Sequence, residues 1–425
     1  MKRLVYLVLV LAASTAAARA APDVTGHWLG TMQRGSSALT VSFDFSPGQP
    51  ERGAFTAGDL GAMDVPLAKL RVEPTIHWEL VGDRTTTVFD GTLNGGTIRG
   101  TFHEDQSRGT FSLRRVSSSV TKPYVETNVR FANGAVTLAG TMLAPRAAGR
   151  YPAVVLTPGS GAEGRWASHF LADYVARHGV VALIYDKRGV GESTGDWRAS
   201  TLADLADDAR AAVHVLADRA GVDRRNVGYF GHSQGAYIAP LVARDNPDVR
   251  WIIAADGNVG PQYRQDLFRV GTSLRKRYTG DDLANAMTLY REFVDVARNG
   301  LPHTQFRADE ARFKNAAWLD DLALPDDQNW IWSWYRQVGN FDNSAAWQST
   351  GVPVLLVYGQ RDEVVPVTES IDAIRALLVS RHNDPTVRIF ASADHTLHIP
   401  PSAPDGWPHN APGFPAILVD WIKAH

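Results

Sequence analysis

The chain has 425 residues, with 43 Lys and Arg against 45 Asp and Glu, so its formal net charge is −2. Binding to nucleic acid relies on clustered positive charge, and this balance therefore predicts no nucleic-acid partner. The sequence contains no cysteine, which excludes disulfides, thiol catalysis and cysteine metal sites. The length is sufficient for two domains, each with a core of its own.

Residues 1–20 carry the pattern of an export signal. Lys2 and Arg3 precede an apolar run at residues 4–13, and a small-x-small cleavage site ends at Ala20. An uncleaved membrane anchor is the alternative, although the run is shorter than the roughly 20 apolar residues of a membrane span. We therefore expect cleavage after Ala20, a periplasmic or secreted protein, and no stable membrane insertion of the mature chain.

Residues 21–118 are predicted to form a small all-β domain. Apolar and polar residues alternate with period two, and glycine-rich turns such as residues 93–96 separate the alternating segments. The clearest of these segments are residues 39–45, 87–90, 97–102 and 109–113. The pattern indicates antiparallel hairpins in a small barrel or sandwich, and residues 117–123, polar and closed by a proline, read as the linker that follows.

Residues 119–425 are predicted to form an α/β domain. Continuous apolar runs, as expected of parallel strands buried on both faces, alternate with helical patterns such as residues 201–220. The apolar runs are residues 152–156, 180–185, 251–255, 352–358 and 387–391. Residues 124–131 and 135–143 look like a hairpin in front of them. The alternation predicts a doubly wound, mostly parallel sheet.

A helical cap is predicted to interrupt this sheet at about residues 260–349. Apolar residues recur at helical spacing over residues 283–297, and Gly300 ends the pattern. The aromatic stretch at residues 330–335 has two interpretations: its rings join the cap to the core, or they line a substrate pocket.

The pentapeptide at residues 231–235, Gly-His-Ser-Gln-Gly, fits the pattern G-x-S-x-G. A short apolar strand at residues 226–230 precedes it, and a helical segment at residues 236–243 follows. Strand, pentapeptide and helix in this order are typical of a nucleophile elbow, in which the glycines allow a tight turn. Ser233 is therefore the candidate catalytic nucleophile.

A serine hydroxyl needs a base to accept its proton, and the base needs an acid to orient it. His395, just past the last predicted strand, is the candidate base, and Asp362, after the preceding strand, is the candidate acid. The chain order Ser, Asp, His differs from the chymotrypsin and subtilisin orders. Asp256, after an earlier strand, is an alternative acid.

Three further residues near these candidates have other readings. Glu363, beside Asp362, is interpreted as a surface charge. His398 lies close enough in the chain to be confused with His395, and Asp394, His395 and His398 could suggest a metal site. A further ligand at useful spacing is missing from that group, so we predict neither a metal nor another cofactor.

Acyl transfer also needs donors for the oxyanion. The backbone N–H of Gln234, directly after the nucleophile, is one candidate. The loop at residues 157–164 would supply the other through Gly159 or Ser160, and Ser160 is the preferred of the two.

With these motifs, residues 124–425 resemble the serine α/β-hydrolase family, close to its esterase and prolyl-oligopeptidase-like branch. The matching stretches are residues 138–143, 157–161, 186–193, 231–235, 358–366 and 393–395. The resemblance implies the α/β-hydrolase fold, with an eight-stranded, mostly parallel sheet, and hydrolysis through an acyl-enzyme. Pro158 stands where many relatives have histidine. Residues 186–193 are interpreted as a structural turn, with the alternative that Arg188 reaches the pocket.

The predicted function is that of an exported serine hydrolase, a carboxylesterase acting on a small-molecule ester through Ser233, Asp362 and His395. One alternative is a serine peptidase or amidase, in which Glu163 or Arg165 would anchor a substrate terminus. The other is a non-catalytic envelope binding protein on a hydrolase fold. We make no prediction of the oligomeric state.

Overall fold

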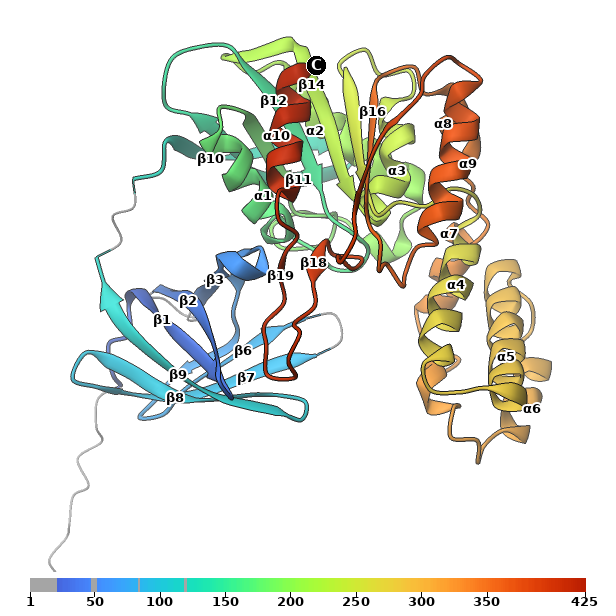
Figure 1. The fold of residues 1–425 in the computed structure, drawn as a ribbon, viewed down its shortest axis with the longest axis horizontal. Helices are drawn as coiled ribbons and strands as arrows, with labels where there is room; N and C mark the ends of the chain where they lie inside the picture. The colour runs from blue at the N-terminus through green and yellow to red at the C-terminus, as the bar shows by residue number, and fades with distance from the viewer. Residues whose placement is uncertain (1–20, 47–51, 83–84, 118–120) are drawn as a thin grey trace, which may run out of the picture.

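The structure, a computed structural model, describes residues 21–46, 52–82, 85–117 and 121–425. The predicted export signal, and residues 118–120 of the predicted linker, lie outside these residues. Two sheets organise the described chain, and a group of helices extends from the second of them (Figure 1). No helix in this part of the chain has the length and apolar character that crossing a bilayer requires.

The first sheet is antiparallel and contains nine strands within the described residues, in the order β4-β3-β2-β1-β9-β8-β7-β6-β5. The strands are β1 (Gly26–Arg34), β2 (Ser37–Ser46), β3 (Arg52–Ala57), β4 (Ala62–Pro66), β5 (Ala68–Val72), β6 (Ile76–Val81), β7 (Thr86–Asn94), β8 (Thr97–Glu104) and β9 (Ser107–Val116), with a 3-10 turn η1 (Gly58–Leu60) before β4. The predicted antiparallel hairpins are present. They build one large sheet and not the two packed sheets of a sandwich. The sheet curls as in a barrel, because Phe43 of β2 contacts Trp78 of β6 although four strands separate them in the sheet.

Aromatic side chains fill the core of this first sheet. Trp78 stacks on Phe89 with ring centroids 5.1 Å apart, and Phe43 meets both rings edge-on. All three side chains are fully buried. Because alternate residues of a strand point to opposite faces, these rings lie on one face of the sheet and produce the period-two pattern in the sequence.

The second sheet has eight strands in the described chain, in the order β10-β11-β13-β12-β14-β15-β16-β17. They are β10 (Tyr124–Asn133), β11 (Val136–Pro145), β12 (Tyr151–Thr157), β13 (Val181–Tyr185), β14 (Val222–His232), β15 (Trp251–Ala255), β16 (Val354–Gly359) and β17 (Thr386–Phe390). The predicted hairpin is β10 and β11, which pair antiparallel, and β11 pairs antiparallel with β13. Every other pair in the sheet is parallel.

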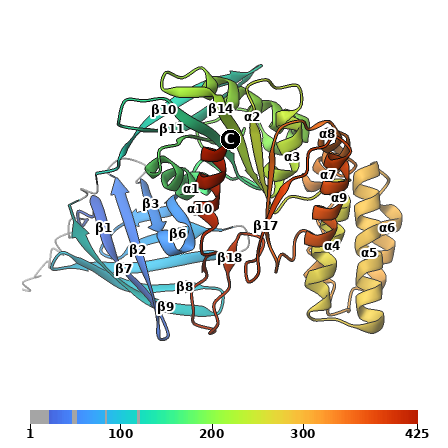
Figure 2. The same cartoon turned by 45° about the horizontal axis from the view of Figure 1, so that its top comes forward.

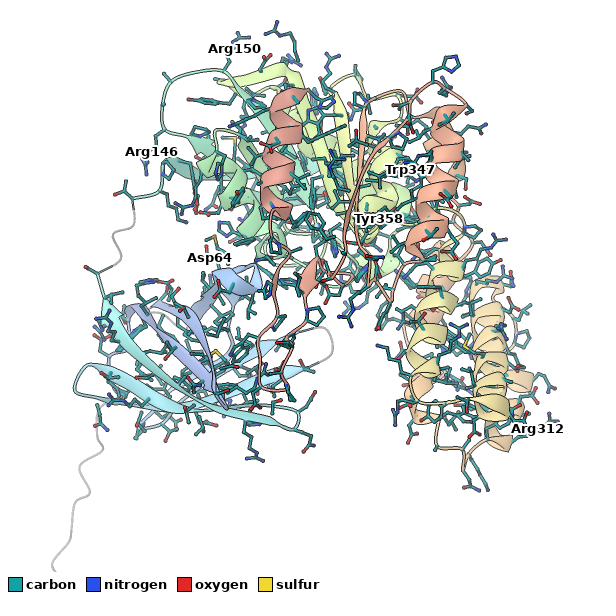
Figure 3. All side chains as sticks on the ribbon, viewed as in Figure 1. Asp64, Arg146, Arg150, Arg312, Trp347 and Tyr358 are labelled. Atoms are coloured by element: carbon teal, nitrogen blue, oxygen red, sulfur yellow. The ribbon has the colours of Figure 1, made fainter. Side chains whose placement is uncertain are left out.

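Helices cover both faces of the second sheet. One face packs against α1 (Trp166–Arg177) and α10 (Phe414–Ala424). The other face packs against α2 (Leu202–Ala217), α3 (Gln234–Ala243), α8 (Ser344–Ser349) and α9 (Val367–Val379). Trp347 of α8 and Tyr358 of β16 lie inside this layer (Figure 3). Pro240 lies inside α3, beyond its first turn.

The predicted cap is helical and is inserted between β15 and β16. It consists of α4 (Gln262–Arg275), α5 (Gly280–Asn299), α6 (Thr304–Arg312), the 3-10 turn η3 (Asp320–Leu322) and α7 (Ile331–Val338). These elements share a core of their own, and Figure 1 shows them standing to one side of the second sheet. The chain leaves and rejoins the sheet at neighbouring points, because Pro261 and Asp342 form an antiparallel bridge.

The two sheets meet along α1 and along the segment between β17 and α10. Residue Asp64 of β4 lies at this boundary, with its carboxylate 3.1 Å from the ring of His169 on α1 (Figure 3). The segment between β17 and α10, residues 391–413, contains the short strands β18 (His398–Ile399) and β19 (His409–Asn410). Figure 2 shows it running from the second sheet to the first. We call residues 391–413 the histidine segment, because His395 lies in it.

Candidate active site

Ser233 occupies a strained turn between β14 and α3. Its backbone has φ 51° and ψ −111°, a left-handed conformation that residues other than glycine rarely adopt. The turn is held by the N–H of Ser233, which donates to the carbonyl of Ala255 at 2.9 Å. A Cβ on Gly231 would lie 2.2 Å from the backbone of Gly235, so only glycine fits the tight crossing at this position. The geometry is that of the predicted elbow.

The structure brings Ser233, His395 and Asp362 together. The Nε2 atom of His395 lies 2.9 Å from Oγ of Ser233, and its Nδ1 lies 2.7 Å from Oδ2 of Asp362. These distances are those of hydrogen bonds. Because the three residues follow β14, β16 and β17, they meet at the carboxyl edge of the parallel strands, where ligands bind in open α/β sheets.

Asp362 is held rigidly behind His395. Its side chain has no exposed surface, and its Oδ1 accepts hydrogen bonds from the backbone N–H groups of Val364 at 2.7 Å and Val365 at 2.8 Å. Oδ2 is thereby left for His395. The adjacent Glu363 pairs with Lys276 on the surface, as its interpretation as a surface charge implied.

Asp256 lies deeper in the same cluster and contacts the backbone instead of the histidine. Its Oδ1 accepts a hydrogen bond from the N–H of Gly359 at 2.9 Å, while its side chain is fully buried. Burial, and then the negative charge of Asp362, raise the pKa of the Asp256 carboxyl well above its usual range. The hydrogen bond to His395 is made by Asp362, and the buried site behind it favours the uncharged form of the Asp256 carboxyl.

Asp256, Asp362 and His395 are also the group of metal-ligand type that the described residues contain, with ligand atoms within 4.8 Å of one another. This is a different group from the Asp394, His395 and His398 suggested by the sequence. Two of its atoms already share the 2.7 Å hydrogen bond between His395 and Asp362. We interpret the group as a hydrogen-bonded acid–base cluster.

His232, inside the pentapeptide, contacts the backbone of His395. Its Nε2 lies 2.8 Å from the backbone carbonyl of His395. Burial, and then the neighbouring His395, lower the pKa of His232 to about 4, so the neutral ring donates this hydrogen bond. The pattern G-x-S-x-G allows any residue at position 232, so the sequence gives no signal for this contact.

His398 faces away from the nucleophile. Its Nε2 lies 2.9 Å from the carbonyl of Leu60, in the turn η1 between β3 and β4, and its Nδ1 lies 2.7 Å from the hydroxyl of Thr396. The structure thus separates the two histidines that the sequence places close together: His395 contacts Ser233 and His398 contacts the N-terminal part of the chain.

The loop predicted to complete the oxyanion hole lies against the nucleophile. A Cβ on Gly159 would be 3.4 Å from Cβ of Ser233, and Gln234 begins α3 directly after the elbow. The ammonium of Lys187 donates to the carbonyls of Gly159 at 2.5 Å and Gly161 at 2.9 Å. Sequence reasoning did not single out Lys187.

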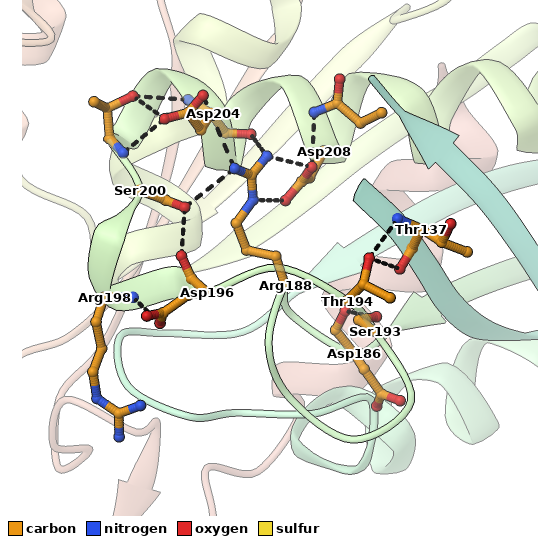
Figure 4. Close-up of polar contacts among 12 residues, drawn as sticks. Thr137, Asp186, Arg188, Ser193, Thr194, Asp196, Arg198, Ser200, Asp204 and Asp208 are labelled. Carbon is orange, nitrogen blue, oxygen red and sulfur yellow. Dashed lines mark hydrogen bonds and ion pairs between the residues drawn. The ribbon is translucent and has the colours of Figure 1, made fainter. Parts of the chain in front are cut away.

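The stretch at residues 186–193 is a structural turn, as interpreted, and Arg188 does not reach the pocket. Its guanidinium lies in the hydrogen-bond network of Figure 4, where it donates to both carboxylate oxygens of Asp208 at 2.7 Å and to the hydroxyl of Ser200 at 3.1 Å. Arg165, a candidate anchor for a peptide terminus, forms an ion pair with Asp186 at 2.7 Å.

The aromatic stretch of the cap packs within the cap and joins it to the core, the first of its two interpretations. Trp332 and Tyr335 are buried in the core of the cap. Trp330 instead keeps 39% of its surface exposed and meets Trp197, which belongs to the 3-10 turn η2 (Trp197–Ala199) of the sheet layer, at 5.1 Å. Trp330 is therefore a contact between the cap and the layer that holds the site.

A family model described as serine aminopeptidase, S33 matches residues 150–401, which include Ser233, Asp362 and His395. The chain belongs to this family. Membership in this family of hydrolases, with the strand order of the second sheet, gives this part of the chain the α/β-hydrolase fold that the resemblance implied.

Curated relatives match shorter stretches. The chain is 24% identical over 268 residues to esterase EstD of Thermotoga maritima, which is 61% of this chain and 58% of the relative. It is 32% identical over 118 residues to thiohydrolase apmlB of Arthrinium phaeospermum, which is 28% of this chain and 38% of the relative. Both matches span less than two thirds of the relative. Among solved structures, this chain is similar to a hypothetical protein of Pseudomonas aeruginosa, with a TM-score of 0.48 and 17% identity. The match covers 72% of this chain and 95% of the chain of that protein.

Proposed function

We propose that this protein is an exported serine hydrolase that cleaves carboxylic esters of small molecules through an acyl-enzyme. The observation that carries the proposal is the continuous hydrogen-bond chain from Asp362 through His395 to Ser233, with distances of 2.7 and 2.9 Å. Such a chain activates a serine hydroxyl as a nucleophile because the imidazole can take its proton while the carboxylate holds the ring.

In the first half of the proposed reaction, Oγ of Ser233 attacks the carbonyl carbon of the ester and its proton passes to Nε2 of His395. The carbonyl oxygen becomes an oxyanion, which the backbone N–H groups of Gln234 and Ser160 would bind. The intermediate then collapses. The bond to the alkoxy group breaks, and the leaving alcohol takes the proton back from Nε2 of His395.

In the second half, water attacks the acyl group on Ser233. Nε2 of His395 accepts a proton from the water and later returns it to Oγ of Ser233, so the acid is released and the free enzyme is regenerated. Asp362 holds the imidazole in place throughout, since its Oδ1 accepts two backbone N–H groups while its Oδ2 accepts Nδ1–H of His395. The proposed cycle uses side chains and backbone N–H groups of this chain, together with water.

The name of the Thermotoga maritima relative, an esterase, supports an ester substrate. The description of the family favours a second candidate, an aminopeptidase. Such an enzyme needs an acidic group to bind the substrate ammonium. Glu163 is the candidate, because its Oε2 lies beside the predicted oxyanion loop, 3.4 Å from the position of a Cβ on Gly159. Arg165, the other predicted anchor, is held by Asp186.

The test is hydrolysis of p-nitrophenyl acetate, butyrate and octanoate beside a set of aminoacyl p-nitroanilides. The mature chain is compared with Ser233→Ala and with Ser36→Ala, an exposed serine in the turn between β1 and β2. We expect ester turnover that falls at least roughly 10³-fold in Ser233→Ala and is unchanged in Ser36→Ala.

Turnover of the anilides without turnover of the esters would contradict the proposed esterase and support the peptidase. Absence of both activities, together with no labelling of Ser233 by a fluorophosphonate, would support the non-catalytic binding protein instead. A preference for the octanoate ester over the acetate would indicate an extended apolar acyl site.

Export rests on residues 1–20, with cleavage after Ala20. Expression of the full chain in a Gram-negative host, followed by fractionation and intact mass, tests it. We expect a periplasmic or secreted product that begins at Ala21. A cytoplasmic product that still carries residues 1–20 would contradict the proposal.

A further inference from the structure

Lys187 is a buried cation behind the predicted oxyanion hole. It follows β13, and only 5% of its surface is exposed. Burying an ammonium group is costly unless it is hydrogen-bonded. Its Nζ donates to the carbonyl of Gly159 at 2.5 Å, to the carbonyl of Gly161 at 2.9 Å, and to Oε1 of Gln234 at 3.3 Å.

These three acceptors belong to the two places from which the oxyanion donors are expected. In a trans peptide the C=O and N–H point in opposite directions. Since the Gly159 carbonyl points at Lys187, the N–H of Ser160 in the same peptide points away from it. The side chain of Gln234, whose own N–H is the other expected donor, is tied to the same ammonium group.

Lys187 acts from a packed interior and does not face a substrate. It lines a cavity of only about 10 Å³, together with Thr157, Pro158, Tyr185 and Gln234. That volume accommodates about one water molecule. Nothing the size of an ester reaches Lys187 through it, so an effect of Lys187 on the reaction has to pass through the groups that it holds.

We propose that Lys187 is a positioning residue of the oxyanion hole, which fixes the Gly159–Ser160 peptide and Gln234 in one arrangement so that their N–H groups converge. The inference rests on the proposed function. It assigns the second oxyanion donor to the N–H of Ser160. It also explains how a loop that begins with Pro158, a residue without an N–H, is oriented. The ammonium group of Lys187 binds the carbonyls of Gly159 and Gly161 and so fixes the direction of their peptides.

The test compares Lys187→Met, which keeps a chain of similar length without donors, with Lys423→Met, an exposed lysine of α10. kcat and KM are measured on a p-nitrophenyl ester, together with the inhibition constant of an alkyl boronic acid, whose tetrahedral adduct needs the oxyanion hole. For Lys187→Met we expect kcat to fall about 10- to 1,000-fold, KM to change less than threefold, and boronic acid binding to weaken in parallel with kcat. Lys423→Met should match the wild type.

Each other outcome overturns the positioning role. A raised KM with unchanged kcat would make Lys187 a substrate-binding residue, and unchanged kinetics would leave it without a role in the reaction. A fall in kcat with boronic acid binding unchanged would place its effect outside the oxyanion hole.

Gln234→Leu covers the case in which Lys187→Met does not fold. It removes one acceptor of Lys187 and keeps the backbone N–H of residue 234, so we expect about a 3- to 10-fold fall in kcat and in boronic acid affinity. Unchanged values in this variant would overturn the inference. The proposed function fails separately: in that case the wild type turns over neither ester nor anilide and Ser233 is not labelled, and the inference falls with it.

Discussion

The ring of His398 and the backbone carbonyl of Leu60, 338 residues apart in the chain, lie 2.9 Å from each other. This contact joins the first sheet to the turn that carries His395. It is one of several. The amide of Asn410 donates to the carbonyl of Gly58 at 3.1 Å, and the guanidinium of Arg34 lies over the ring of Trp407 at 4.1 Å. The first sheet therefore holds the histidine segment at several points.

The anchoring of the histidine segment predicts a loss of activity far from the reacting atoms. Trp407 packs into the core of the first sheet beside Phe102, with ring centroids 6.0 Å apart. Trp407→Ala should release the segment and lower kcat about 10- to 100-fold, because small displacements of a catalytic group are costly in rate. Ester kinetics and hydrogen exchange over residues 391–413 measure both effects.

Trp421→Ala is the matched control for this prediction. Trp421 is a partly buried tryptophan of α10 that packs against the second sheet. Its replacement should lower stability without raising exchange in the histidine segment. Equal losses of kcat in the two variants would contradict an anchoring role for Trp407.

Asp256 gives a pH dependence of stability with a definite sign. The fold raises the pKa of its carboxyl through burial and through the charges of Asp362 and Asp394. Between the ordinary carboxyl pKa, about 4, and the raised pKa of the folded state, the unfolded chain loses this proton and the folded chain keeps it, so the free energy of unfolding falls as the pH rises through that window. Asp256→Asn cannot titrate, and should be more stable than the wild type at pH 8, with a difference that shrinks toward pH 4 by up to about 1.4 kcal/mol per pH unit.

Urea unfolding of Asp256→Asn at several pH values checks this prediction, and activity is its control. Because Asp362 remains bonded to His395, we expect ester turnover within about threefold of the wild type, while Asp362→Asn loses about 10⁴-fold. A loss in Asp256→Asn as large as that in Asp362→Asn would make Asp256 the acid of the site.

The close packing of Gly231 in the elbow predicts that an added methyl group lowers stability as well as turnover. Gly231→Ala places a methyl group 2.2 Å from the backbone of Gly235, which has to move, and we expect a loss of about 1–3 kcal/mol in stability together with loss of ester turnover. Gly351→Ala has open space around its Cβ and a backbone without positive φ. It should be neutral or slightly stabilising in thermal unfolding. Equal effects of the two substitutions would refute the steric account.

Arg188 and Asp208 form a buried ion pair that links the turn after β13 to α2. Their side chains are 9% and 2% exposed. Asp208→Asn leaves the guanidinium without its charged partner, and we expect a loss of about 3–5 kcal/mol in the free energy of unfolding. Asp223→Asn, in the exposed pair with Arg225, should leave the urea midpoint unchanged. A small effect of Asp208→Asn would show that the turn is held by its other contacts.

Much of the second sheet and the meeting of the three site residues could be predicted from the sequence. Buried parallel strands leave continuous apolar runs, and residues that follow such strands gather at one edge of the sheet. Ser233, Asp362 and His395 each follow a strand, so their positions after those strands were enough to predict that they meet.

What could not be predicted are contacts that have no local pattern. Lys187 stands next to Arg188 in the sequence, yet the two cations point to different partners, because the turn at residues 186–193 sends one to the loop at Gly159 and the other to Asp208. The contact of His398 with Leu60 depends on the packing of two separate sheets. The extent of the first sheet could not be predicted either, since β4 and β5 are short and partly exposed, and β4 lacks a clear alternation.

The cap leaves and rejoins the sheet at one place. Pro261 bridges Asp342, and the hydroxyl of Tyr237 lies 2.7 Å from the carbonyls of both Gly260 and Phe341. Helices α4 to α7 have a core of their own, and Ser233, Asp362 and His395 all lie outside them. The cap is therefore a separate insertion whose first and last residues lie next to each other. An insertion of this kind can be exchanged by recombination for another helical segment while the reacting groups stay in register, which gives evolution, or an engineer, a route to new substrates that does not disturb the chemistry.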